Sequence, residues 1–200
     1  MNKLLITWMA ILLTSIANGQ DFTGVYSFNK GLNKPNGILY FMQFAPDSAF
    51  LYLSTTSGNP DFLSTDIKGM VKIDSSITYI KQAAACRLEL TLLKTSIIVK
   101  QDTGCQYEYT TAGTYKKTSH VIKRSPTMVI NYTEKPARAK QDSLEVFVAP
   151  SLQAKSKVIL CKENDIKIID EFNAFFLIEH KKYKTEFMWV QKKNLLIPKK

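Results

Sequence analysis

The chain has few side chains of the kinds that carry out chemistry. Its 200 residues include two histidines and three cysteines. A zinc hydrolase usually brings at least two histidines together, but His120 and His180 fall in different parts of the chain, so we expect no metal site. Because His180 stands between Glu179 and Lys181 at the end of an apolar run, it is expected on the surface.

The other catalytic arrangements are also missing from the sequence. Cys161 lies in VILCKEN, between apolar neighbours, where we expect a buried thiol, since no histidine base lies near it in the sequence. Asp170 and Glu171 are adjacent on a predicted strand and would face opposite sides, unlike the paired carboxylates of a glycosidase. The eight glycines are scattered among turns, with no phosphate loop. We therefore expect no catalytic residue, no cofactor and no enzyme activity.

Aromatic residues near the C-terminus are the remaining candidates. Trp189, Tyr183 and Phe175 are the candidate ligand-binding residues, because flat rings can stack on sugars or peptides and the basic neighbours can meet carboxylates. Packing in a core is the alternative. It is favoured for Phe176 and Phe187, and it stays open for Trp189 and Tyr183.

The other two cysteines fall in a stretch that predicts three antiparallel strands, residues 86–115. If Lys94 and Thr95 form the first turn, Cys86 lies opposite about position 103, within reach of Cys105. A disulfide there would clamp the hairpin and contribute about 3 kcal/mol in the chain-entropy model.

The first nineteen residues have the form of a signal peptide. Lys3 precedes an apolar run at 4–16 and small residues at 17–19. The run is short for a bilayer span, and no second one follows. We therefore predict a periplasmic or secreted protein. Without Lys3, its formal charge of +10 falls to +9, and it would then meet anionic envelope polymers or lipid head groups rather than nucleic acid.

The remaining chain predicts an all-β protein with two domains. Residues 20–117 contain about eight short strands, which predict an antiparallel barrel or sandwich, and a closed barrel is favoured because closure removes exposed edges. Residues 118–141 are basic and interrupted by Pro126 and Pro136, which predicts a linker. Residues 142–200 contain five strands, enough for a small barrel.

Two resemblances follow from these segments. The run VFVAPSLQAKSKVI at 146–159 and the later EFMWVQKKNL, with Trp189-Val190 in place of the usual Gly-Trp-Val, resemble a bacterial SH3-like (SH3b) domain. Met188 replaces the glycine of that motif, and Asn164-Asp165 replaces a lysine-glycine turn. Residues 20–117 run from FTGVY at 22–26 to GTYK at 113–116. They look like small exported barrels, similar in architecture to bacterial inhibitors of c-type lysozyme.

The SH3-like resemblance implies a cell-envelope setting. Such domains often bind wall peptide or polymer, and some are spacers. We therefore expect an exported, non-enzymatic envelope protein that binds peptidoglycan or an envelope protein through its SH3-like module. The alternatives are inhibition of a lytic enzyme by the first barrel and binding of a small apolar ligand inside that barrel.

Overall fold

The computed structural model describes residues 20–31, 34–58, 64–74, 77–81, 87–101, 112–123, 135–160, 166–183 and 186–198. Cys86, Cys105 and Cys161 lie outside these ranges, so the predicted disulfide does too, as does the predicted signal peptide at 1–19. Within the described ranges, no helix has the length and apolar character needed to cross a membrane.

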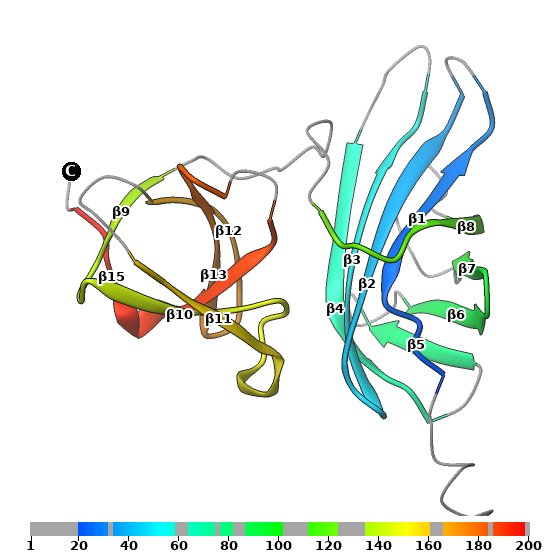
Figure 1. The fold of residues 1–200 in the computed structure, drawn as a ribbon. Helices are drawn as coiled ribbons and strands as arrows, with labels where there is room; N and C mark the ends of the chain where they lie inside the picture. The colour runs from blue at the N-terminus through cyan, green and yellow to red at the C-terminus, as the bar shows by residue number, and fades with distance from the viewer. Residues whose placement is uncertain are drawn as a thin grey trace, which may run out of the picture.

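The chain is all-β, as predicted, and its first half forms one antiparallel sheet of eight strands. The strands are β1 (Gly24–Asn29), β2 (Asn36–Ala45), β3 (Ser48–Thr56), β4 (Ser64–Lys72), β5 (Ile77–Lys81), β6 (Arg87–Leu93), β7 (Ser96–Gln101) and β8 (Gly113–Ser119). Their order is β4-β3-β2-β1-β8-β7-β6-β5, so β1 pairs with β8 and the sheet curls round (Figure 1). The described ladder does not join β4 to β5, so closure of the barrel is not seen.

Large side chains fill the inner face of this first sheet. On β2 and β3, Leu39, Phe41, Leu51 and Leu53 are fully buried and point inward at alternate positions. They pack with buried residues of β1, β4, β6, β7 and β8, including Tyr115. The interior is therefore a packed core.

The second half forms a sheet of seven strands in the order β11-β10-β14-β13-β12-β9-β15. The strands are β9 (Lys135–Ala139), β10 (Ser143–Phe147), β11 (Lys155–Leu160), β12 (Ile166–Phe172), β13 (Phe175–His180), β14 (Met188–Gln191) and β15 (Leu195–Leu196), with short 3-10 helices η1 (Leu152–Ala154) and η2 (Lys192–Asn194). Figure 1 shows this sheet curled on itself, and its inward residues form a second core.

The predicted linker 118–141 is partly strand. Strand β8 continues to Ser119, and β9 pairs with both β12 and β15. Ala137 anchors β9, because it is buried and packs inside the second core. With one buried alanine and an internal proline, Pro136, β9 shows almost no alternation of apolar and polar residues. The sequence therefore shows no sign of this strand.

The two sheets pack against each other. A third core joins them, formed by the outer faces of β2 and β3 against the outer faces of β10 and β12–β14. Figure 1 shows the second sheet beside the β2–β4 part of the first. We call this contact the seam. Its buried members are Tyr40, Met42, Phe50, Tyr52, Phe147, Ala149, Ala154, Ile169, Phe175, Leu177, Phe187 and Trp189.

Candidate functional site

Two of the three predicted ligand-binding residues lie inside the seam. Trp189 is 0% exposed, and its ring meets the Phe50 ring edge to face at 5.3 Å. Phe175 is 6% exposed and packs in the same way on Phe147 at 5.5 Å. Of the two alternatives left open for Trp189, the structure shows core packing. Neither ring offers a face on which a ligand could stack.

Tyr183, the third candidate, is half-buried at the edge of the second core. The Lys157 ammonium lies 4.2 Å from the centre of its ring and also pairs with the Glu186 carboxylate at 2.5 Å. The His180 ring lies on the same tyrosine, with 5.3 Å between ring centroids. The exposed part of Tyr183 is therefore flanked by a cation and an imidazole.

The surface position expected for His180 is wrong. Its side chain is buried at 4% exposure, and its Nδ1 accepts a hydrogen bond from the Lys182 backbone N–H at 3.1 Å. The chain turns back here, because the Tyr183 N–H donates to the His180 carbonyl at 2.8 Å. Among the residues described, no three histidine, cysteine or acidic side chains gather as a metal site.

A buried polar cluster crosses the seam. The Asp170 carboxylate, 6% exposed, accepts hydrogen bonds from the Tyr52 hydroxyl at 3.2 Å and from the Lys68 ammonium. Burial raises the pKa of Tyr52 strongly, and the nearby Asp66 and Asp170 carboxylates raise it further, so Tyr52 stays a donor. Glu171 points the other way and pairs with Lys192 at 3.0 Å. The cluster connects β3 and β4 to β12.

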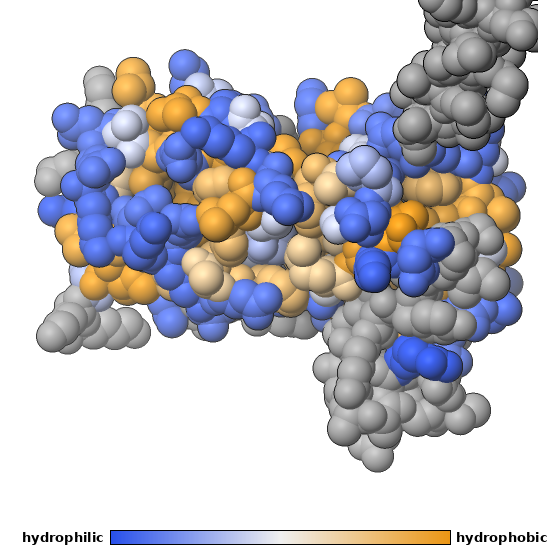
Figure 2. All heavy atoms as spheres, turned by 90° about the horizontal axis from the view of Figure 1, so that it is seen from below, coloured by the Kyte–Doolittle hydropathy of each residue, from blue (hydrophilic) through white to orange (hydrophobic). Residues whose placement is uncertain are grey.

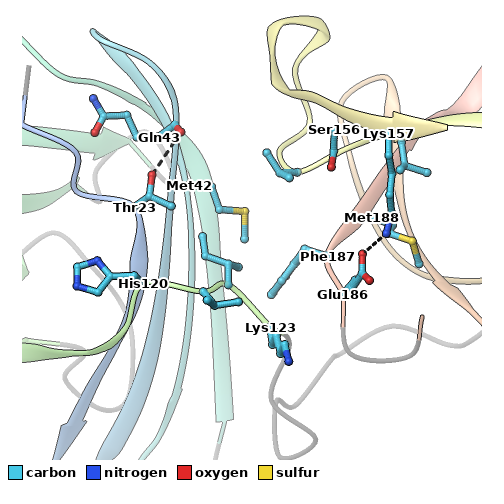
Figure 3. Close-up of a pocket in the computed structure, with 14 residues that line it drawn as sticks. Thr23, Met42, Gln43, His120, Lys123, Ser156, Lys157, Glu186, Phe187 and Met188 are labelled. Carbon is cyan, nitrogen blue, oxygen red and sulfur yellow. Dashed lines mark hydrogen bonds and ion pairs between the residues drawn. The ribbon is translucent and has the colours of Figure 1, made fainter. Parts of the chain in front are cut away.

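A cavity of about 400 Å³ opens at one edge of the seam (Figure 3). One wall comes from the first sheet, the opposite wall from the second sheet, and a third from residues 120–123, which follow β8. On the face shown in Figure 2, hydrophobic side chains lie between the two units with hydrophilic ones around them. The apolar lining residues are Met42, Val121, Ile122, Val146, Val148, Phe187 and Met188.

Some polar groups of this seam cavity are already satisfied. Thr23 Oγ1 donates to the Gln43 carbonyl at 3.4 Å (Figure 3). The Gln43 side chain accepts from the Phe22 N–H at 3.0 Å and donates to the Pro46 carbonyl at 3.1 Å. Gln43 therefore holds the C-terminal end of β2 in place and has little hydrogen-bonding capacity left for a ligand.

Two polar groups of the seam cavity remain available. Neither the Ser156 hydroxyl nor the Lys123 ammonium makes a hydrogen bond or ion pair within the part of the chain that the structure describes. No sequence motif marks these residues. The lining comes from segments that are far apart in the chain and meet only because the sheets pack together.

The fold and this cavity define the chain as an all-β protein of two joined sheets with a ligand-sized space at their junction. Comparison with family models, curated proteins and solved structures finds no match.

Proposed function

We propose that the protein is a non-enzymatic binding protein that holds a small, largely apolar ligand in the seam cavity. The observation that supports this most is the cavity itself. Its volume of about 400 Å³ lies within the range of roughly 300–1,000 Å³ that ligand pockets occupy, and such pockets are common between domains. Its lining is mainly apolar, with the Ser156 hydroxyl and Lys123 ammonium available to orient a ligand.

Several side chains of the cavity wall are packed in the cores, so this part of the cavity is formed before a ligand arrives. Met42 and Met188 are each 1% exposed, and Phe187 is 6% exposed. Phe187 is held by the rings of Tyr40 and Tyr52, at centroid distances of 4.8 and 6.0 Å. A pre-formed apolar site loses little free energy to ordering on binding.

This proposal moves the expected apolar-ligand site from the first barrel to the seam. The interior of the first sheet is filled by its own side chains, including Tyr26 and Tyr115. Docking on wall polymer through Trp189 has no support, since that ring is buried. Export, an envelope setting and the SH3-like character of residues 142–200 remain part of the proposal, and the curled second sheet is compatible with the last. No contact described above favours inhibition of a lytic enzyme.

A matched pair of valine variants tests the proposal. Val148 lines the seam cavity and is 40% exposed, so Val148→Trp should block the cavity without disturbing a core. Val158 is 56% exposed on the edge strand β11 and does not line this cavity, so Val158→Trp is the control. The probe is N-phenyl-1-naphthylamine, a neutral dye whose fluorescence rises in apolar surroundings.

The unaltered protein and Val158→Trp should bind the dye saturably with one site per chain, and Val148→Trp at least tenfold more weakly. Far-UV circular dichroism and the urea midpoint show whether each variant is folded. Equal dye binding by both folded variants, or binding that does not saturate in the unaltered protein, would contradict the proposal.

A further inference from the structure

A second, polar cavity of about 610 Å³ shares one lining residue with the seam cavity. Its lining residues are Gln20, Asp21, Lys94, Thr95, Lys117, Thr118, Ser119 and His120. His120 belongs to both linings, and Figure 3 shows its ring directed away from Phe187 and Lys123. The residues on either side of it divide between the cavities, because Ser119 lines the polar one and Val121 the apolar one. The two spaces are therefore neighbours along one chain segment.

The polar cavity has more basic than acidic side chains. Lys94, Lys117 and His120 face a single carboxylate, that of Asp21. The Asp21 carboxylate accepts a hydrogen bond from the Thr23 N–H at 2.8 Å. Burial alone would raise the pKa of Asp21, but its hydrogen bonds with Thr23 and the charges of Lys117 and His120 lower it overall.

Lys117 is held in place by the first sheet. Its ammonium lies 5.4 Å from the centre of the Tyr26 ring, and its side chain passes over Gly24, where an added Cβ would come within 2.5 Å of the Lys117 Cε. Gly24 thus leaves the space that the lysine occupies. Burial lowers the pKa of Lys117, and the neighbouring Asp21 carboxylate opposes that shift.

Lys94 is the cation of the polar cavity that is left for a ligand. It lies in the exposed turn between β6 and β7 and makes no ion pair within the described residues. Lys117, by contrast, is already close to Asp21. An anion in this cavity would therefore meet Lys94 directly, with His120 and the Thr95 hydroxyl beside it. The Thr118 and Ser119 hydroxyls already donate to the carbonyls of Val25 and Val121.

We propose that the two cavities form one site for a single-chain amphipathic anion. The alkyl chain lies in the seam cavity between Met42 and Phe187, and the anionic group lies beyond His120, next to Lys94. The inference rests on the proposed function, because it assigns a ligand class to the same cavity. Burial of the chain supplies most of the affinity, and the exposed cation adds a preference for negative charge.

Decanoate and 1-decanol test this assignment, because they share a chain and differ in charge. At pH 8 the carboxylate is ionised. Each ligand displaces the naphthylamine dye from the full chain, and the apparent Kd is compared at 20 mM and 500 mM NaCl. At low salt we expect decanoate to bind at least threefold more tightly than 1-decanol. At high salt the ratio of the two apparent Kd values should approach one.

Charge variants locate the anionic group. Lys94→Gln should reduce the preference for decanoate by about two- to fivefold, as expected for an exposed charge pair, and Asp21→Asn should increase it. Lys34→Gln is the control, because Lys34 lies in the loop between β1 and β2, at the other end of β1 from Gly24. It should leave both affinities unchanged.

Each outcome separates this inference from the proposed function. Equal affinities for decanoate and decanol would overturn the inference and leave the seam cavity as an apolar site. Loss of the preference in Lys123→Gln but not in Lys94→Gln would overturn the placement of the anion. Binding of anionic phosphatidylglycerol vesicles without displacement by decanoate would overturn the single-chain ligand. Failure of the dye itself to bind would overturn the proposed function.

Discussion

Phe50→Ala distinguishes a shared core from two independent sheets. Phe50 points to the outer face of β3 and is 0% exposed because Phe172 and Trp189 cover it, with ring centroids at 5.2 and 5.3 Å. Truncation of a buried phenylalanine costs about 3–5 kcal/mol. If the sheets did not pack together, this face would be in water and the cost would fall to about 0.5 kcal/mol or less.

Met70 provides a matched control on the same face. It is the cross-strand neighbour of Phe50 on β4, but it is 41% exposed. Met70→Ala should therefore cost less than about 1 kcal/mol. The loss in free energy of unfolding should then differ between these two neighbours mainly because the second sheet covers Phe50 and not Met70.

Urea unfolding measures both variants with two probes. Far-UV circular dichroism reports all strands, whereas fluorescence reports Trp189, the only tryptophan after residue 19. We expect coincident transitions, because the seam joins the sheets into one cooperative unit. A Phe50→Ala cost no larger than that of Met70→Ala, or two separate transitions in the unaltered protein, would refute the shared core.

Three further predictions concern single contacts. Tyr52→Phe removes the hydrogen bond to Asp170 and should cost about 1 kcal/mol in urea; no loss would mean that the bond is not formed. Gly113→Ala places a Cβ 2.6 Å from the Phe28 ring, so thermal unfolding should show a loss of about 1–3 kcal/mol, and an unchanged melting temperature would contradict this close packing. Burial, and secondarily the Asp21 carboxylate, raises the pKa of Tyr26 to about 12, above the unfolded value near 10. The contribution of neutral Tyr26 to the free energy of unfolding is therefore complete below pH 10 and is lost as the pH rises through 12. Urea midpoints of Tyr26→Phe should fall less over that range than those of the unaltered protein.

Local signals predicted the strands and several turns. The turn at 45–48, which contains Pro46, joins β2 to β3, and the predicted turn at Lys94-Thr95 joins β6 to β7. Both depend on turn residues and on side-chain alternation, which are local properties of the chain.

The seam was missed because alternation shows which residues share a face and does not show what covers it. In β14, Met188 and Val190 point into the second core, and Trp189 points outward. From the sequence alone, Trp189 was a candidate for ligand stacking, and packing in a core stayed open. The runs GILYFMQF and AFFLIEH are apolar on both faces, which is typical of strands buried on both sides, but nothing in them identifies the partner surface.

The cavity had no sequence signal at all. Met42, His120 and Phe187 belong to three distant segments, and each looks ordinary in its local context. Their juxtaposition depends on how the sheets dock. The buried position of His180 likewise depends on a turn that folds the backbone over its ring.

The late position of β14 has a consequence for biosynthesis. The aromatic face of β2 and β3 is synthesised first, and the strand that brings Trp189 to cover Phe50 follows only after all the strands of the first sheet. Until then, a nascent chain displays rings that attract other unfinished chains. A premature stop codon just before β14 would therefore yield an aggregating product, even though every strand of the first sheet had been translated.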